Sequence, residues 1–224
     1  MATIDEDVAG CLTDLLLPVM RYRVAQLGLS ASGAFEFYRS RLETNRVFCE
    51  YELDLVKSII REIPQLDEIY EIGCGWGQLV FLLAWSGYNA TGFEIDDRRF
   101  SGAEYFRKIL CHIDESRAKR ATILNEFFPP VRRPSSNLNL VISTNIVVSN
   151  PQFVEDQILW SLPRYRYSII NLDRFCRERQ VSERPGFIAR VEQTGLRNLG
   201  MFCDAGQDGQ FYLFERAGSR EADK

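Results

Sequence analysis

The period at which apolar residues recur changes along the 224-residue chain, and the change divides it into two parts. Up to about residue 64, apolar residues recur every three to four positions, which predicts helices. From residue 68 onward, short apolar runs alternate with helical stretches, which is typical of a doubly wound, mostly parallel sheet. We therefore expect a helical leader at 1–64, an α/β domain at 65–216 and a polar tail at 217–224.

Helices are predicted in the leader over about residues 4–27, 33–42 and 46–62. Thr3 and Glu6 have the spacing of a capping box, which starts the first helix. Pro18 is expected to interrupt or restart it, because proline cannot donate the helical hydrogen bond. The third helix carries an apolar stripe that would lie on a sheet, formed by Val47, Phe48, Tyr51, Leu55, Val56, Ile59, Ile60 and Ile63.

Seven strands are predicted in the α/β domain. Five should be parallel, at 68–72, 89–94, 121–124, 138–143 and 167–172. Helices are expected between them or after them, at 78–86, 98–111, 151–160 and 186–193. The last two strands, 199–203 and 211–215, are joined by a short polar turn, so they are expected to pair as an antiparallel hairpin.

A glycine-rich turn, residues 73–77, follows the first strand directly and leads into an apolar helix. Glycines at alternate positions allow left-handed backbone dihedrals and a close approach of a ligand to the chain. The helix behind the turn directs free N–H groups and its positive dipole end toward the same place. Glu71 precedes the turn, and Glu94 ends the next strand about 20 residues downstream, where doubly wound folds bind ribose hydroxyls. The pattern predicts a nucleoside site.

The glycine spacing distinguishes two kinds of nucleotide. A dinucleotide fingerprint, G-x-G-x-x-G, faces a pyrophosphate, whereas this chain has Glu-x-Gly-x-Gly-x-Gly. A carboxylate at Glu71 would repel a pyrophosphate but suit a ligand with an amino group and a sulfonium. With this turn, and the phrase at 91–96 that contains Glu94, the chain resembles the class I S-adenosylmethionine-dependent methyltransferases. The resemblance covers about residues 69–214 and includes the final hairpin, which plain dinucleotide domains lack.

The resemblance implies a Rossmann-like methyltransferase domain with a defined set of cofactor contacts. The expected members are Glu71, Gly73, Cys74, Gly75, Gly77, Glu94, Ile95, Asn125, Glu126, Phe127 and Ser143. The glycine turn would contact the methionine part of S-adenosylmethionine, and Glu71 would bind its ammonium directly or through water. Glu94 would accept both ribose hydroxyls, with Ile95 against the adenine. Residues 125–126 are Asn-Glu where the family often has Gly-Asp, and Phe127 fits core packing as well as an adenine contact.

Methyl transfer is an in-line displacement, so the protein mainly holds donor and acceptor in line and keeps water out. Ser143, Thr144 and Asn145 leave the fourth strand where the family faces the sulfonium and the acceptor, and Asn145 is the candidate for acceptor placement. The chain continues Ile-Val-Val at 146–148 and lacks the N-P-P-Y phrase of amino methyltransferases that act on bases or glutamine.

The sequence offers one candidate for a general base. Asp173, just past the fifth strand, is placed to take a proton from a hydroxyl acceptor. The alternative is that Asp173 pairs with Arg174 or Arg177 and only shapes a loop. The single histidine, His112, is expected on the surface at the far end of a helix. No cluster of aspartates and histidines indicates a metal ion.

The leader is a candidate lid over the cofactor, since leaders in this family often shape the acceptor pocket. Residues suited to that role are Phe35, Phe37, Tyr38, Arg39, Arg41 and Arg46. The alternative is that the aromatic residues are core and the arginines are solvated. Further arginines suited to an anionic acceptor are Arg164, Arg166, Arg174, Arg177 and Arg179.

Composition narrows the partners. The net charge is −4, which gives no general attraction to nucleic acid or to anionic membranes. Six scattered cysteines form no C-x-x-C pair, and the acidic N-terminus does not resemble a signal peptide, so we expect a cytoplasmic protein with reduced thiols. The oligomeric state stays open.

The expected function is S-adenosylmethionine-dependent methylation of a small polar metabolite, on oxygen. Two alternatives are a methyltransferase-like module without activity and a nicotinamide-dependent oxidoreductase. The intact turn with both acids argues against the first, and the glycine spacing and the hairpin argue against the second.

Overall fold

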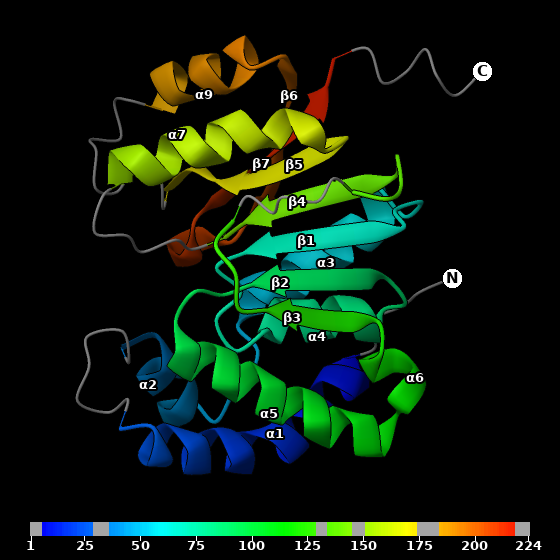
Figure 1. Ribbon diagram of the computed structural model, residues 1–224, viewed down its shortest axis with the longest axis vertical. Helices are drawn as coiled ribbons and strands as arrows, with labels where there is room; N and C mark the ends of the chain where they lie inside the picture. The colour runs from blue at the N-terminus through cyan, green and yellow to red at the C-terminus, as the bar shows by residue number, and fades with distance from the viewer. Residues whose placement is uncertain (1–5, 29–35, 129–133, 145–150, 174–183, 218–224) are drawn as a thin grey trace.

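The computed structural model describes residues 6–28, 36–128, 134–144, 151–173 and 184–217. One seven-stranded sheet forms the centre, with the order β3-β2-β1-β4-β5-β7-β6 (Figure 1). Its strands are β1 Glu68–Ile72, β2 Asn89–Phe93, β3 Ala121–Leu124, β4 Asn139–Ser143, β5 Tyr167–Asn171, β6 Leu196–Asp204 and β7 Gln210–Arg216. The first five are parallel, and β7 runs antiparallel to both β5 and β6. The predicted fold class is confirmed, including the antiparallel hairpin.

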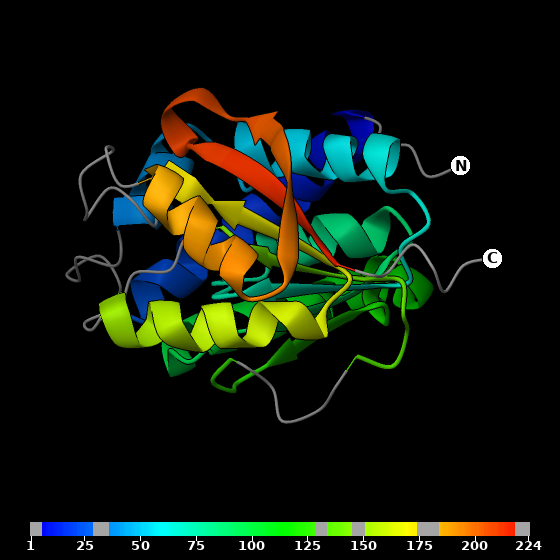
Figure 2. The same cartoon turned by 90° about the horizontal axis from the view of Figure 1, so that it is seen from above.

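Helices cover both faces of the sheet. They are α1 Glu6–Gln26, α2 Glu36–Glu43, α3 Glu50–Glu62, α4 Gln78–Trp85, α5 Asp97–Ile113, α6 Glu115–Ala118, α7 Pro151–Ser161 and α9 Arg184–Gln193, with short 3₁₀ helices η3 Leu162–Arg164 and η5 Gly206–Asp208. The views in Figures 1 and 2 show α3 and α4 on one face and α7 on the other. In Figure 1, α2 lies toward the side to which β1–β4 point. Among the described helices, none combines the length and apolar content required to cross a membrane.

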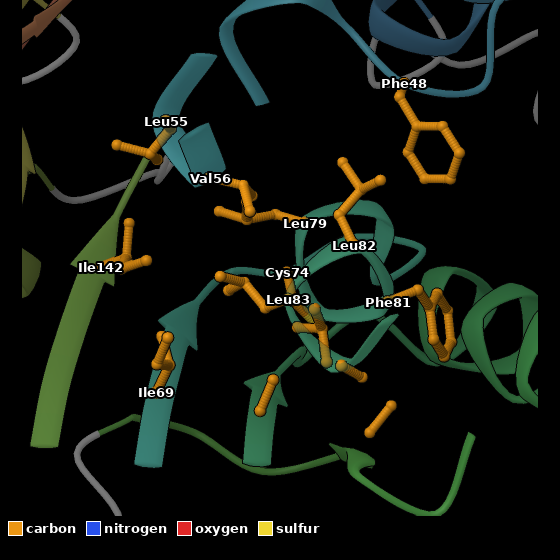
Figure 3. Packing of buried hydrophobic residues seen from close by; sticks show 14 of the residues in the cluster. Phe48, Leu55, Val56, Ile69, Cys74, Leu79, Phe81, Leu82, Leu83 and Ile142 are labelled. Carbon is orange, nitrogen blue, oxygen red and sulfur yellow. The ribbon is translucent and has the colours of Figure 1, made fainter. Parts of the chain in front are cut away.

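Two cores lie on the two faces of the sheet, because successive strand residues point to opposite sides. Ile69 of β1 and Ile142 of β4 face the leader helices, α4 and α5, in the larger core. Figure 3 shows Leu55 and Val56 of α3 on the same side as Leu79 of α4, above these strands. The helices of the leader and of the α/β part therefore share one core. The smaller core lies under α7 and α9.

The first helix differs from the sequence expectation at Pro18, because α1 runs through the proline without a break. A buried stripe at four-residue spacing, Leu12, Leu16, Met20 and Val24, holds the helix against the body. A proline inside a helix costs about 3 kcal/mol or more. Burial of one leucine-sized side chain contributes about 1.5–3 kcal/mol, so the stripe outweighs the missing hydrogen bond.

The connection from β3 to β4 contains no helix within its described residues, 125–128 and 134–138. Phe128 covers the sheet instead, with its ring centroid 5.5 Å from that of Phe93 and 6.2 Å from that of Tyr165. The Glu68 carboxylate anchors the returning chain, accepting hydrogen bonds from the backbone N–H groups of Ser135 and Ser136 at 3.1 and 3.2 Å. The described residues on both sides of 129–133 are therefore held against the sheet.

Candidate functional site

The glycine turn between β1 and α4 has the conformation that its composition predicts. Gly73, Gly75 and Gly77 have φ angles of 69°, 59° and 76°, in the left-handed region that favours glycine. The Cys74 N–H donates to the Phe93 carbonyl at 3.0 Å, so the turn is joined to the end of β2. A Cβ on Gly75 would lie 2.9 Å from the hydroxyl oxygen of Tyr38. The dihedral angle and the nearby hydroxyl both disfavour a larger residue at this position.

Trp76 anchors the turn in the core beneath it. Its indole is fully buried, and its ring centroid lies 5.4 Å from that of Tyr38 and 5.3 Å from that of Phe106. A Cβ on Gly102 of α5 would lie 2.6 Å from Cδ2 of Trp76, so helix and indole pack in direct contact. These contacts fix Trp76, and with it the backbone of the turn, against α5 and Tyr38.

Glu94, one residue after β2, is buried and forms two hydrogen bonds with backbone amides. Oε2 accepts from the Gly75 N–H at 2.9 Å, and Oε1 accepts from the Asp96 N–H at 2.9 Å. Burial raises the pKa of Glu94, while these amides and Arg99 oppose the rise. Since a carboxylate has about four acceptor positions, two remain for other donors. Glu94 therefore stabilises the turn and keeps capacity for ribose hydroxyls.

Glu71, in β1, is also buried but accepts fewer hydrogen bonds than Glu94. Oε1 accepts one hydrogen bond, from the Thr144 hydroxyl at 3.3 Å, and Oε2 has no partner among the described residues. Burial, followed by the nearby Glu52 carboxylate, raises the pKa of Glu71 well above its usual range. A buried polar atom without a hydrogen bond destabilises a fold by about 1–3 kcal/mol. An unsatisfied carboxylate oxygen at the edge of a glycine turn is suited to a cationic ligand.

The leader contains a buried ion pair, and the charge of its Glu52 carboxylate helps to raise the pKa of Glu71. Arg41 of α2 binds Glu52 of α3 in two places, Nη1 to Oε2 at 3.0 Å and Nη2 to Oε1 at 2.7 Å. The two side chains are 2% and 4% exposed. Arg41 also donates to the Val47 carbonyl, and Glu52 accepts from the Cys49 N–H at 2.8 Å. Sequence analysis included Arg41 among the lid candidates but missed Glu52. The only sequence signal for Glu52 is its position three residues after Cys49, the N-cap of α3.

The residues expected around adenine lie on the surface at the carboxyl ends of β2 and β3. The side chain of Ile95 is 67% exposed and that of Phe127 is 46% exposed, so Phe127 is not a core residue. Phe128 takes that core position instead. Asn125 donates to Asp97 at 2.6 Å, and Glu126 is exposed. These side chains are accessible to a ligand, and their contact with adenine stays a prediction.

On the acceptor side, Ser143 and Thr144 are buried at the end of β4, whereas Asn145 falls outside the described residues. The Ser143 hydroxyl has no hydrogen-bond partner among the described residues. Asp173 forms an ion pair with Arg184 of α9, and its Oδ2 accepts from the Gln210 N–H at 3.0 Å. Arg174 and Arg177, the partners considered in the sequence, also fall outside the described residues.

Several expected acceptor and lid residues lie elsewhere. Arg164 and Arg166 precede β5, at the amino edge of the sheet, so their expected contact with an acceptor at the carboxyl edge is wrong. Arg164 instead lies over the Trp160 ring at 4.1 Å. Arg46 forms an exposed ion pair with Glu50 at 2.5 Å. The remaining acceptor candidates, Arg174, Arg177 and Arg179, and the lid candidates Phe35 and Phe37 have no described side chains.

His112 lies in the last turn of α5, on the surface and at the opposite end of that helix from Glu94, as expected. Within the ranges that the structure describes, no group of three or more histidine, cysteine, aspartate or glutamate side chains is arranged to hold a metal ion. The carboxyl edge holds two buried carboxylates, the glycine turn and polar residues that follow β4 and β5.

The fold is that of solved S-adenosylmethionine-dependent methyltransferases. A TehB-like enzyme of this class from Corynebacterium glutamicum matches with a TM-score of 0.52 and 15% identity, over 86% of this chain and 98% of that one. Magnesium protoporphyrin IX methyltransferase from Synechocystis, with bound S-adenosylmethionine, gives 0.57 and 15%, over 87% and 97%. The ribosomal protein L11 methylase of Lactobacillus delbrueckii gives 0.53 and 14%, over 75% and 79%. No protein-family model and no curated protein sequence matches this chain.

Proposed function

We propose that this protein is an S-adenosylmethionine-dependent methyltransferase that methylates a small polar acceptor on oxygen. One observation carries the proposal: Glu71, a left-handed glycine turn and Glu94 lie together at the carboxyl ends of β1 and β2. Ligands of open α/β sheets bind at this edge. Solved methyltransferases that share the fold support the same reading.

The residues of the edge fit the three parts of the cofactor. The unsatisfied Oε2 of Glu71 would accept the methionine ammonium, and the turn from Gly73 to Gly77 would lie along the amino-acid chain. The open acceptor positions of Glu94 would receive the ribose hydroxyls, and the exposed Ile95 and Phe127 would border the adenine. The bound cofactor supplies an electrophilic methyl group on sulfur. The protein's task is then to orient the acceptor and to exclude water.

The acceptor would lie beyond β4 and β5. Ser143 lines this side with a buried hydroxyl, and Asn145 follows it in sequence as the candidate for placing the acceptor. Asp173 is the proposed base for a hydroxyl acceptor, a role that requires it to turn one oxygen from Arg184 toward the substrate. The N-P-P-Y phrase of amino methyltransferases that act on bases or glutamine is absent after Asn145, which argues against those nitrogen acceptors.

Asp173→Asn tests the chemical part of the proposal. The change keeps size and polarity but removes basicity, so turnover on a hydroxyl acceptor should fall about 10²–10⁴-fold. Cofactor affinity should be unchanged, and the acidic limb of the pH–rate profile should flatten. Arg184→Gln is the matched control, since it breaks the same ion pair and leaves the carboxylate. Normal turnover of the asparagine variant would assign catalysis to proximity and would favour an amine acceptor.

Calorimetry tests the cofactor. S-adenosylmethionine and S-adenosylhomocysteine should bind the purified protein, and NAD should not. Glu71→Gln should weaken both sulfur nucleosides, whereas Glu115→Gln, which changes an exposed carboxylate on α6, should not. Tight NAD binding without a response to either sulfur nucleoside would overturn the proposal. Transfer of labelled methyl to a metabolite extract then identifies the acceptor, and cofactor binding without transfer to any acceptor would favour a non-catalytic module.

A further inference from the structure

Three polar residues from separate elements meet just beyond the end of β5. Arg184, the first residue of α9, forms an ion pair with Oδ1 of Asp173 through its Nη2. Gln210, the first residue of β7, binds both: its side-chain Oε1 accepts from Nη1 of Arg184 at 2.9 Å, and its backbone N–H donates to Oδ2 of Asp173 at 3.0 Å. Each oxygen of Asp173 therefore has a partner, and a base has to release one of them.

The two partners of Asp173 differ in how firmly they are held. Gln210 follows Gly209, whose backbone packs so closely on the buried Asn171 amide that a Cβ would have no room. The same amide donates to a carbonyl of the turn before β7 at 2.9 Å, so this turn is fixed on the end of β5. Arg184, by contrast, reaches Asp173 through a long side chain that is 26% exposed. Its bond to Oδ1 is therefore the one that exchanges more easily.

We propose that Arg184 determines acceptor specificity, and that the acceptor is a small hydroxy acid with a carboxylate beside the hydroxyl that is methylated. The inference rests on the proposed function, in which Asp173 is the base. The carboxylate of the acceptor replaces Asp173 on Nη2 of Arg184, while Oδ2 of Asp173 stays on the Gln210 N–H. Oδ1 is then free to face the acceptor hydroxyl.

This exchange allows a balanced methyl transfer. The proton of the acceptor O–H passes to Oδ1 of Asp173, and a lone pair of the acceptor oxygen forms the bond to the methyl carbon of the donor. The carbon–sulfur bond breaks, and its electron pair stays on sulfur. The products are a methyl ether and S-adenosylhomocysteine, and Asp173 returns its proton to solvent before it pairs with Arg184 again.

The guanidinium of Arg184 offers an anion a place that Asp173 does not fill. Its Nε is buried and has no hydrogen-bond partner within the described ranges. Nε and Nη2 donate along the same side of the guanidinium, so a carboxylate that replaces Asp173 on Nη2 can accept from both. A neutral acceptor cannot make this exchange, because it would leave a partly buried cation without an anion. An acceptor that releases Asp173 is therefore anionic.

The neighbouring charges favour a carboxylate over a phosphate. Gln210 also donates from Nε2 to Oδ2 of Asp204 at 3.4 Å, so its amide joins Arg184 to a second acid. Asp204 is exposed, and water screens its charge. A carboxylate replaces the charge of Asp173 one for one. A phosphate brings a charge of about −1.5 to −2, which adds repulsion from both aspartates.

Labelling of a metabolite extract by the full chain gives the first test. With methyl-labelled S-adenosylmethionine, mass spectrometry should find a free carboxylate and a methyl ether in the product. A product without a carboxylate, or a methyl ester, would overturn the inference and leave methyl transfer by the protein intact. Failure of the proposed function gives a different result, since no labelled product would then form.

Binding without turnover is the second test. Calorimetry compares the acceptor identified by labelling with its carboxamide, each added to the complex with S-adenosylhomocysteine. The wild type should bind the carboxamide at least about tenfold more weakly, because charge-assisted bonds to Arg184 are lost. In Arg184→Gln the two compounds should bind within about threefold of each other. The same discrimination in Arg184→Gln as in the wild type would overturn the inference.

Three further variants separate recognition of the anion from structural support. Arg184→Lys keeps the charge without the planar fork, so its discrimination should lie between those of the wild type and Arg184→Gln, and it serves if the glutamine variant does not fold. Gln210→Met removes a partner of Arg184 but keeps the N–H that binds Asp173, so the acceptor KM should rise and kcat should stay within about threefold. Arg107→Gln breaks a comparable pair on α5 and should change neither. A fall in kcat with unchanged KM in Gln210→Met would mean that Arg184 only supports Asp173, and would overturn the inference.

Discussion

Two buried carboxylates on adjacent strands of the same sheet edge have opposite surroundings. Glu94, after β2, is 3% exposed and accepts backbone N–H groups on both oxygens. Glu71, in β1, is 5% exposed and accepts one hydroxyl at 3.3 Å. The residue type and the burial are the same, so the difference lies in the hydrogen bonds that the backbone provides.

The comparison separates two functions of an acidic residue at a nucleoside site. Glu94 is part of the framework, since it joins the Gly75 amide to the end of β2 before any ligand binds. Glu71 contributes little to the framework and retains an unsatisfied oxygen. Groups that are poorly satisfied in the free protein gain most from a ligand. We therefore expect loss of Glu71 to affect binding, and loss of Glu94 to affect binding and folding together.

The largest expected effect is that of Glu71→Gln on cofactor affinity. Removing one partner of a buried charge pair costs about 2–5 kcal/mol, so affinity for S-adenosylhomocysteine should fall at least about thirtyfold. The ligand-free protein should become more stable at neutral pH, by about 0.5–2 kcal/mol, as is common when a poorly satisfied functional group is replaced. Calorimetry and urea denaturation measure the two effects. A variant that loses stability together with affinity would remove the contrast with Glu94.

Glu94→Ala should weaken both properties. A hydrogen bond to a charged group contributes about 1.5–3 kcal/mol, so affinity should fall at least about tenfold, and urea denaturation should show a lower free energy of unfolding. Glu94→Gln is the matched control, because its amide oxygen still accepts one backbone N–H. Its affinity and its free energy of unfolding should lie between those of the wild type and of Glu94→Ala. An unchanged dissociation constant in a folded alanine variant would exclude Glu94 from the ribose site.

Gly75→Ala tests the turn that lies between the two carboxylates. The left-handed dihedral at φ 59° costs a non-glycine residue about 1–2 kcal/mol, and the new Cβ would lie 2.9 Å from the Tyr38 hydroxyl. The free energy of unfolding should fall by at least that amount. Tyr38→Phe in the same chain removes the hydroxyl, so it should restore the steric part and not the dihedral part. Thermal unfolding of the single and double variants separates the two.

The smallest expected effect is the dependence of the free energy of unfolding on pH. Burial raises the pKa of Glu71 well above its usual range. It also raises the pKa of Glu94. The folded state therefore binds more protons than the unfolded state above the usual carboxyl pKa, and stability is lost as pH rises through the folded pKa. The slope reaches about 1.4 kcal/mol per pH unit for one group. Urea denaturation at several pH values should show this decline in the free energy of unfolding, and Glu71→Gln should flatten it. An equal slope in the variant would contradict the assignment of the decline to Glu71.

Much of the fold could be predicted from the sequence, because strand residues such as Ile69–Ile72 and the glycines after them signal their structure locally. The two acids were also found, since Glu71 and Glu94 have fixed places relative to the turn. Their different hydrogen bonding could not be predicted, because it depends on amides brought close by tertiary structure. The same holds for the Asp173–Arg184 pair, whose partner lies beyond the arginines considered first.

The path of α1 through Pro18 and the buried pairing of Glu52 with Arg41 have a similar explanation. Both depend on how the leader packs against the α/β part, and no short motif records that packing. A buried apolar stripe outweighed a local helix breaker in the first case. In the second, a glutamate near the start of α3 is buried because α2 supplies Arg41 as its partner.

The burial of Trp76 within the glycine turn gives the protein an internal optical reporter. Its indole packs against Gly102 and lies between Tyr38 and Phe106, directly under the backbone expected to contact the ligand. Trp160 is 63% exposed on the far part of α7, and Trp85 ends α4, so phenylalanine at both positions would leave a single emitter. The emission wavelength and lifetime of that indole would then follow the turn itself, in a titration that requires neither a labelled ligand nor a known acceptor.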